Sequence, residues 1–163
     1  MPMTDPMVTL SKLQGALDAG VVTLSPCSIH KELGVIADYP GGTPRFTYAL
    51  LKHGHVVAIS VFAYTEMVDN VPCFQVGYAV REEDRNAGLG ASILAKGIDE
   101  LKRSLSGTPI RQLFLEAVVS SSNTASMKIA YRNISKFPRE ITDEFSGEDA
   151  LQYREKVECS AFP

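Results

Sequence analysis

The stretch from residue 74 to residue 119 constrains the fold of this 163-residue chain more than any other part of it. Apolar side chains alternate with small or polar ones from Phe74 to Val80, which predicts a strand. An apolar stripe at helical spacing predicts a long amphipathic helix from about Gly88 to Leu105. A near-continuous apolar run from Arg111 to Val119 predicts a second strand that is buried on both faces. A strand, a helix and a strand in this order form a β-α-β unit, whose two strands run parallel.

The rest of the chain predicts an antiparallel meander ahead of this unit and two more strands behind it. Strands are expected ahead of the unit at residues 31–38, 46–52 and 56–64, with turns at 40–44, 53–55 and 69–70. Helices are expected at 9–18, started by Thr9 or Ser11 and ended by Gly20, and at about 124–135 after a capping region. Two short strands are expected near 140–145 and 151–157. A meander joined to a β-α-β unit gives a mixed sheet with helices packed on it, an α/β or α+β fold.

Composition predicts one globular domain that spans residues 1–163. Hydrophobic residues make up 45% of the chain, which suits a single core at this length. The formal net charge is -3, so a broad attraction to nucleic acid is not expected. The three cysteines, Cys27, Cys73 and Cys159, are far apart and odd in number, which argues against a disulfide framework and a zinc site. We therefore expect a cytoplasmic protein with no metal and, because no leader-like or long apolar stretch is present, no membrane association.

The segment from Arg85 to Gly90 carries the clearest chemical signal. Its glycines, Gly88 and Gly90, lie where the predicted strand gives way to the predicted helix. Glycine lets a backbone approach a ligand closely, and the first turn of a helix presents unpaired N–H groups to an anion. Arg85 adds a cation, so the segment suits a phosphate or pyrophosphate. The alternative is that the glycines only shape a tight turn; the segment is neither a dinucleotide fingerprint nor a P-loop.

The pattern Arg-x-x-Gly-x-Gly followed by Ala91 resembles the acyl-coenzyme A signature of the GNAT N-acetyltransferase superfamily. The run from Val76 to Asp84 is similar to that family's fourth strand and the short loop after it, and residues 113–118 are similar to its fifth strand. Asn123-x-x-Ser126-x-Lys128 resembles the start of the family's next helix. The resemblance covers roughly residues 45 to 157 and implies a GNAT-like mixed, mostly antiparallel sheet around the β-α-β unit.

The resemblance also implies where coenzyme A would bind. In that family the fourth and fifth strands splay apart and admit the pantetheine arm between them. By resemblance, main-chain groups of the predicted strand would hold the arm, namely those of Tyr78, Ala79 and Val80. Residues around the glycine turn would wrap the pyrophosphate, namely Arg85, Asn86, Ala87, Gly88, Leu89, Gly90 and Ala91, and Asn123 would lie beside the arm from the other side. The implied activity is transfer of an acetyl group from acetyl-coenzyme A to an amine, by direct attack in a ternary complex and without a metal.

Two residues are candidates for acid–base catalysis. Glu116 lies within an apolar run, where a carboxylate is costly unless it is paired or functional. The family often has a carboxylate near this position that acts as the base, directly or through water; the alternative is an ion pair with Arg or Lys of a neighbouring strand. Tyr131 is the candidate general acid, although the usual position, counted from Asn123, falls on Ala130, and one residue rotates a helical side chain by about 100°. The alternative for Tyr131 is an ordinary packed aromatic.

The acceptor side is expected to be open. Family members commonly carry two helices between their first two strands, whereas here the strand at 31–38 runs through a short turn into Phe46. An open groove favours a protein or peptide amine over a small metabolite, without excluding the latter. Glu66 and Asp69 could select a cationic acceptor, with a solvated turn as the alternative. His53, His55 and Cys73 are not expected to be catalytic, because the histidines flank a hairpin glycine and the cysteine has no histidine partner nearby in sequence.

Two other functional classes remain open at this point. One is a GNAT-like module that binds coenzyme A or a protein partner without catalysis, which the displaced Tyr131 favours. The other is a phosphate-binding α/β protein of a different family. The sequence does not determine the oligomeric state, and a homodimer is compatible with it.

Overall fold

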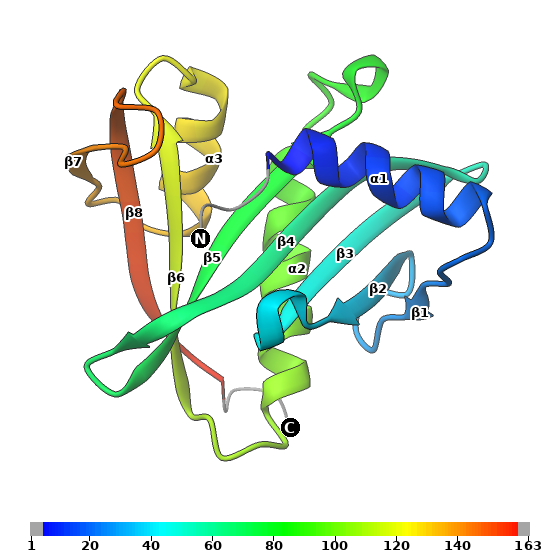
Figure 1. Ribbon diagram of the computed structural model, residues 1–163, viewed down its shortest axis with the longest axis horizontal. Coiled ribbons are helices and arrows are strands. Elements are labelled where there is room, and N and C mark those ends of the chain that lie inside the picture. Colours follow the sequence, from blue (N-terminus) through cyan, green and yellow to red (C-terminus); the bar gives the residue numbers. More distant parts are fainter. Residues whose placement is uncertain (1–4, 160–163) are drawn as a thin grey trace.

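One twisted sheet of eight strands organises the structure, a computed structural model that describes residues 5–159 (Figure 1). The helices of the described chain are α1 (Pro6–Asp18), α2 (Leu89–Leu105) and α3 (Thr124–Asn133), with short 3₁₀ turns η1 (Pro40–Gly42) and η2 (Glu82–Asp84). Its strands are β1 (Ser25–Pro26), β2 (Leu33–Asp38), β3 (Arg45–Lys52), β4 (His55–Val68), β5 (Val71–Val80), β6 (Gln112–Ser120), β7 (Arg139–Thr142) and β8 (Asp149–Glu158). They lie side by side in the order β1-β2-β3-β4-β5-β6-β8-β7.

The β-α-β unit forms as the sequence predicts. Strands β5 and β6 are parallel neighbours joined by α2, and every other neighbouring pair of described strands is antiparallel. The fold is therefore the expected mixed, mostly antiparallel sheet. The predicted meander is β2 to β5, with the expected turn after β3 at residues 53–54 and the one after β4 at Asp69-Asn70, where both residues have positive φ.

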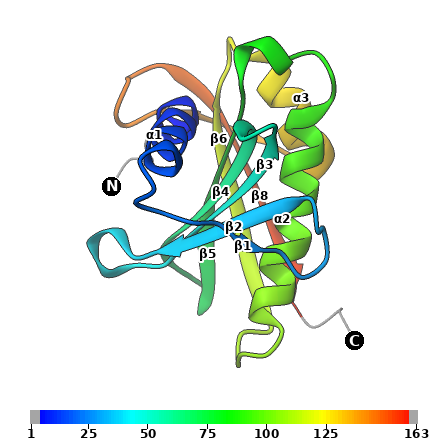
Figure 2. The ribbon, with the colours of Figure 1, turned by 90° about the vertical axis from the view of Figure 1, so that its right-hand side faces the viewer.

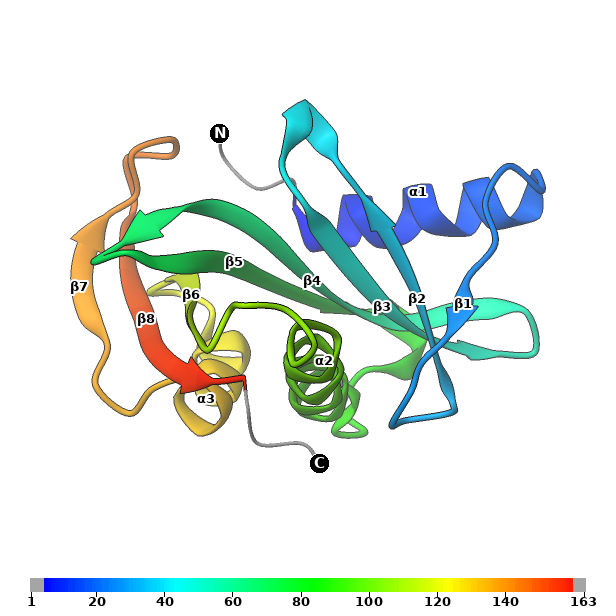
Figure 3. The same cartoon turned by 90° about the horizontal axis from the view of Figure 1, so that it is seen from below.

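The two faces of the sheet are covered unequally. Helices α2 and α3 lie on one face and α1 lies on the other (Figure 3). The larger core lies under α2 and α3, and a smaller core joins Leu10 and Leu13 of α1 to β3, β4 and β5. Because α1 packs on β4 and β5, the β6 strand is not buried on both faces, contrary to the prediction. Its side chains alternate instead between full and partial burial, and Glu116 is on the partly buried side.

Several elements differ from the sequence-based expectations: β4 runs to Val68 instead of ending near residue 64, and β7 ends at Thr142 instead of near residue 145. Helix α1 starts at Pro6, earlier than predicted, because the Asp5 side chain accepts a hydrogen bond from Met7 N–H at 2.9 Å and acts as the N-cap in place of Thr9 or Ser11. Strand β8 is long, not short, because it pairs with β6 along the whole of β6. Strand β1 was not predicted; it has only two residues, Ser25 and Pro26, paired with β2.

Helix α2 approaches the sheet closely at one glycine. A Cβ atom on Gly97 would lie 2.9 Å from Phe62 Cε2 and would also meet the Ser60 hydroxyl. Ser60, itself buried on β4, donates a hydrogen bond to Ile93 O at 3.0 Å. Gly97 thus fixes the depth at which α2 rests on β4, and with it the position of the helix's first turn.

A buried carboxylate of α2 binds the segment between β1 and β2. The carboxylate of Glu100, only 3% exposed, accepts hydrogen bonds from the main-chain N–H groups of Ser28, Ile29 and His30 at 2.6–3.2 Å. These three donors satisfy the buried charge, so Glu100 fastens the segment after β1 to the helix.

No helix among residues 5–159 has the length and apolar character that a bilayer crossing requires.

Candidate active site where β5 and β6 diverge

Strands β5 and β6 pair over only three residues before they separate. The parallel register joins Cys73 to Phe114, Phe74 to Leu115 and Gln75 to Glu116, and the strands diverge beyond it toward the end of the sheet at which α3 lies (Figure 1). On its other edge β5 stays paired with β4 up to Val80. A wedge-shaped opening therefore forms between two strands that both remain firmly held by their outer neighbours.

Main-chain groups line both walls of this wedge. Arg81 N–H donates to Val57 O at 2.8 Å, so alternate residues of β5, including Ala79, direct their main-chain groups at β4. The main-chain groups of Val76, Tyr78 and Val80 face β6 instead. On the opposite wall, Cys159 N–H donates to Arg111 O at 2.9 Å, and the same alternation turns the main-chain groups of Val118 toward β5. An extended polar chain lying in the wedge would meet donors and acceptors from both strands.

The side chain of Tyr78 braces the wedge from the α2 side. Its hydroxyl donates a hydrogen bond to Ser126 O in the first turn of α3 at 2.7 Å. Burial raises the pKa of the Tyr78 hydroxyl well above its ordinary value, so the group stays a neutral donor. Tyr78 therefore connects β5 to α3 on the α2 side of the opening.

The first turn of α2 opens into the same space. Gly88 is the N-cap residue in the left-handed region, with φ +75°, and Asn86 shares that conformation at φ +65°. The first helical hydrogen bond joins Ser92 N–H to Gly88 O at 3.2 Å, so the N–H groups of Leu89, Gly90 and Ala91 precede it. No acidic residue lies in this turn, and the cap makes no side-chain hydrogen bond. The turn is thus a positively polarised end of a 17-residue helix, suited to an anion.

Arg85 and Gly90 shape the surroundings of this turn. Arg85 Nε donates to Val80 O at 3.2 Å, which holds the guanidinium at the end of β5. A Cβ atom on Gly90 would lie 2.8 Å from Ile129 Cδ1, so only glycine lets α2 and α3 come this close without a shift. Figure 2 shows the loop at 81–88 and α3 at the same end of the molecule. Gly88 therefore permits a left-handed backbone conformation, whereas Gly90 permits the close packing of α2 against α3.

A continuous groove of about 2120 Å³ joins the wedge, the α2 turn and the opposite face of the sheet. It is lined by most of the residues predicted from the sequence, namely Tyr78, Val80, Arg85, Asn86, Gly88, Leu89, Gly90, Ala91, Glu116 and Asn123. Ala79 and Ala87 do not line it; the Ala79 side chain belongs to the smaller core under α1. Asn123 also caps α3, because its side chain accepts from Ser126 N–H at 3.1 Å.

Glu116 lies where the wedge begins, on the side of the sheet away from α2. Its carboxylate accepts hydrogen bonds from Gln152 Nε2 at 2.9 Å and from Arg154 Nη2 at 2.8 Å and Nε at 3.1 Å. Burial opposes the charged form, but the hydrogen bonds from Gln152 and Arg154 and the charge of Arg154 outweigh it and hold the pKa of Glu116 below its ordinary value. The predicted alternative, an ion pair with a neighbouring strand, is thus present.

Cys73 belongs to the same cluster. Its Sγ lies 3.5 Å from Glu116 Oε2, and burial raises the pKa of the thiol to about 11. The thiolate is the nucleophilic form of cysteine, and here it is disfavoured. This agrees with the expectation that Cys73 is not a nucleophile.

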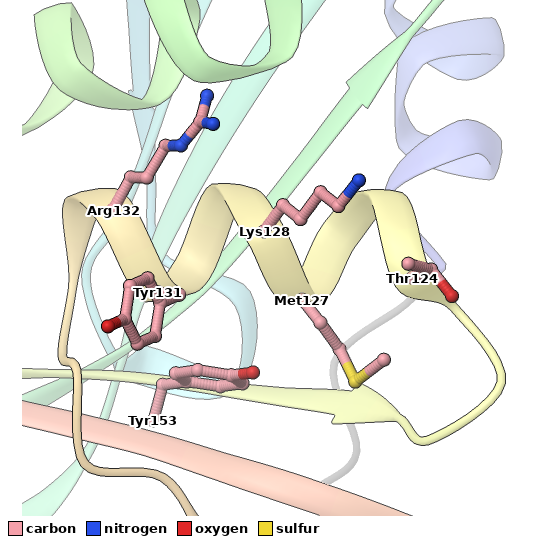
Figure 4. A pocket seen from close by; sticks show the side chains of 6 residues that line it. All are labelled: Thr124, Met127, Lys128, Tyr131, Arg132 and Tyr153. Carbon is pink, nitrogen blue, oxygen red and sulfur yellow. The ribbon is translucent and has the colours of Figure 1, made fainter.

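Tyr131 lies outside the groove. It is 48% exposed and lines a smaller pocket of about 360 Å³ between α3 and β8, together with Met127 and Tyr153 (Figure 4). On α3, Ala125 and Ile129 line the large groove, and Tyr131 is on another flank. The geometry therefore gives no support to the expectation that Tyr131 is the general acid.

Several groove residues were given no individual role from the sequence. Arg154 and Gln152 come from β8 and position Glu116, while Lys128 and Arg132 project from α3 into the groove. The spacing of Lys128 and Arg132, four residues apart on a helix, could have indicated a shared face. The role of Arg154 depends on the pairing of Glu116 with Arg154 across two strands, which no local pattern reveals.

On the α1 face of the sheet, the groove is bounded by the start of α1, by η1 and by the loop between β7 and β8. As predicted, β2 passes into β3 through a short connection and not through a pair of helices. Exposed Glu66 lines this part of the groove, whereas Asp69 belongs to the turn after β4. His53 and His55 lie at the exposed turn between β3 and β4, outside the groove lining.

No protein-family model matches the sequence, and no curated protein matches it. Solved structures do match. Ribosomal-protein-alanine N-acetyltransferase from Brucella melitensis has 16% identity and a TM-score of 0.54, over 92% of this chain and 95% of its own. RimJ from Mycobacterium smegmatis, in complex with a coenzyme A disulfide, has 17% identity and a TM-score of 0.54, over 72% of this chain and 55% of its own.

RimL, a ribosomal L7/L12 α-N-protein acetyltransferase in complex with coenzyme A, has 18% identity and a TM-score of 0.52. The match covers 72% of this chain and 64% of RimL, so the present chain spans less than two thirds of both RimL and RimJ. The chain has the fold of the GNAT acetyltransferases, as the glycine segment and its flanks predicted.

Proposed function

We propose that this chain is an acetyl-coenzyme A-dependent N-acetyltransferase. The observation that carries the proposal is the divergence of β5 from β6 next to the start of α2, where the N-cap residue is Gly88 and no side chain caps the helix. A thioester on a long polar arm with a diphosphate at its other end fits this combination, because one part offers a row of main-chain groups and the other an anion site. The solved structures of similar fold that hold coenzyme A support the same reading.

In this proposal the arm lies along β5, held by the main-chain groups of Tyr78 and Val80. Ala79 does not contact the arm in this proposal, because its main-chain groups face β4 and its side chain belongs to the smaller core. The pyrophosphate is bound by the N–H groups at the start of α2, with Arg85 as a neighbouring cation. Asn123, which also lines the groove, is proposed to lie beside the arm from the other side.

The acceptor amine attacks the thioester from the Glu116 side of the sheet. The bond from nitrogen to the acyl carbon forms, the bond from carbon to sulfur breaks, and coenzyme A leaves as a thiol. The amine must lose a proton, and a carboxylate with a lowered pKa is a weak base. We therefore assign Glu116 the role of orienting the amine, or a water that takes its proton, with orientation of the two substrates supplying much of the rate.

A protein or peptide amine is the proposed acceptor. The short connection from β2 to β3 leaves the acceptor side open, and the named neighbours RimL and the Brucella protein are acetyltransferases of ribosomal proteins. A test compares peptides carrying a free α-amine or a lysine with free polyamines, at equal concentrations. Faster turnover of the polyamines would contradict the acceptor assignment and leave the acetyltransferase assignment intact.

The activity itself is tested by thiol release from acetyl-coenzyme A across a panel of amines. Acetyl-coenzyme A should bind in calorimetry, and at least one amine should release free thiol in proportion to acetylated product found by mass spectrometry. Absence of binding heat would contradict the proposal as a whole. Replacement of Glu116 by Gln should lower kcat and leave the binding of acetyl-coenzyme A unchanged, because Glu116 is on the acceptor side.

A second candidate is a GNAT-like domain that binds coenzyme A without catalysis. It is favoured by two specific observations: Tyr131 lies outside the groove, and the Glu116 carboxylate is tied to Arg154. Binding of acetyl-coenzyme A without thiol release for every acceptor in the panel would support this candidate over the enzyme.

A further inference from the structure

Two cations of α3 face the groove without an ion pair to any residue in the described range 5–159. Lys128 and Arg132 are both exposed, lie one helical turn apart and line the groove. Their side chains extend away from Tyr131 in Figure 4, and they lie at the border between the groove and the smaller pocket that Tyr131 lines, since both residues line both. A like-charged pair at this spacing weakens a helix slightly, so the helix gains nothing from having both.

Their place on α3 sets them beside the anion site of α2. Ile129, which follows Lys128 in sequence, contacts α2 where Gly90 leaves room for its Cδ1 atom. Lys128 and Arg132 therefore belong to a wall next to the first turn of α2, yet on a different element from the N–H groups of that turn. A ligand that fills the α2 turn and carries a second anionic group nearby would meet this wall.

Other arginines of the groove are already engaged. Arg45 pairs with Asp38, and Arg154 pairs with Glu116, so their charges are balanced, whereas Arg139 donates a hydrogen bond to the neutral side chain of Gln152 at 2.8 Å. Asp84 also lines the groove but pairs with Arg81, so Arg85, Lys128 and Arg132 are the groove cations on the side of α2 and α3 that form no ion pair among residues 5–159. An anion with more charge than a diphosphate alone fits this side of the groove.

The chemistry of coenzyme A supplies such a second anion. Its pyrophosphate diester has two negative charges, which the α2 turn and Arg85 can offset. Its ribose also has a 3′-phosphate monoester, which carries a charge of roughly −1.5 to −2 near neutral pH. Resting on the function proposed above, we infer that Lys128 and Arg132 form a subsite for this 3′-phosphate. The subsite makes free acyl-coenzyme A the donor in preference to an acyl carrier protein, whose phosphopantetheine arm lacks the 3′-phosphate.

Calorimetry with coenzyme A and 3′-dephospho-coenzyme A tests the subsite. Wild-type protein should bind coenzyme A about tenfold more tightly than the dephospho form, since two exposed charge contacts contribute about that much together. The double variant K128Q/R132Q should lose this preference and bind the dephospho form within about twofold of wild type. The double variant K12Q/K136Q removes two exposed lysines outside the groove and should keep the preference, which controls for net charge.

The outcomes separate the subsite from the function on which it rests. Equal losses for both ligands in K128Q/R132Q, or an undiminished preference, would overturn the subsite. Equal binding of the two ligands by wild-type protein would overturn it as well, while leaving the acetyltransferase proposal standing. Wild-type protein that binds neither ligand would overturn the proposed function and the subsite together. All the substituted residues are exposed, so melting temperatures should confirm that each variant is folded.

Discussion

The cluster around Glu116 shows how one side chain can serve both the fold and the site. Its side chain is 17% exposed, and its carboxylate accepts three hydrogen bonds from β8, in addition to the Cys73 contact from β5. These bonds span the point at which β5 and β6 begin to separate. Removal of a partner therefore leaves a half-buried charge without its counter-ion.

Replacing Arg154 by Gln should lower the free energy of unfolding by about 1–3 kcal/mol at pH 7. The pKa of Glu116 is lowered from its ordinary value of 4.5 by folding, so its ionised form stabilises the folded state above that pH. This stabilisation is lost as the pH falls through the folded-state pKa, and the difference from wild type should shrink there. Urea denaturation at a series of pH values, from pH 7 down to the acid limit of the folded protein, measures it.

The control for this prediction is Lys156→Gln, an exposed cation on the same strand. It should change stability by no more than about 0.5 kcal/mol at either pH. A destabilisation of the Arg154 variant that stays constant across the pH range would contradict the assignment of its effect to the ionised Glu116.

Gly88 permits a second prediction at the scale of a residue. Gly88→Val introduces side-chain atoms where the N–H groups of the α2 turn should meet an anion, and it strains a backbone with φ +75°. The affinity of the Gly88→Val variant for acetyl-coenzyme A should fall by about tenfold or more relative to wild type. Gly20→Val is the matched control, because Gly20 has φ +69°, has open space around it and lies outside the groove. Equal affinity losses in the two variants would mean that strain alone is responsible.

At the scale of an element, the packing of α2 on β4 depends on a missing side chain. Gly97→Ala places a methyl group against Ser60 and Phe62, which should cost about 1–3 kcal/mol of unfolding free energy. Gly15→Ala in α1, where nothing lies within 4 Å, should instead gain up to about 1 kcal/mol from helix propensity. Chemical denaturation of both variants measures these opposite changes in the free energy of unfolding. A more stable Gly97→Ala variant would refute the close approach of α2 to β4.

The elements that the sequence predicts well are those whose signals are local. Alternation in β5, the amphipathic stripe of α2 and the turn glycines depend on residues that are neighbours in sequence, so their type and order could be predicted. The glycine segment likewise predicted the turn from strand to helix at the start of α2, and an anion site there stays a prediction.

Elements and site residues that depend on long-range pairing could not be predicted. The length of β8 follows from its pairing with β6, and the partial burial of β6 follows from the placement of α1 on β4 and β5. The position of Tyr131 depends on the rotation of α3 about its own axis, which places that side chain in the smaller pocket and not in the groove. The pairing of Glu116 with Arg154 likewise depends on the register between two strands.

At the scale of the whole molecule, two cores share one sheet. Leu13 anchors α1 on the smaller core, and Leu101 of α2 lies in the larger one on the other face. Leu13→Ala should lower the free energy of unfolding by about 2–4 kcal/mol in a single transition, because each core stabilises the same strands. Val8→Ala, at an exposed position of the same helix, should have little effect. Separate transitions by circular dichroism and tyrosine fluorescence would show that the two cores unfold independently.

The three-residue pairing of β5 with β6 has a consequence for how the folded state is maintained. Strands β1 to β5 and strands β6 to β8 form two half-sheets joined by few rungs, so a cosubstrate lying between them would serve as a missing strand. Such a ligand at a hundred times its Kd adds about 2.7 kcal/mol to stability. Amide hydrogens at 76–80 and 117–120 should then exchange more slowly, and the lifetime of the protein should follow the supply of its cosubstrate.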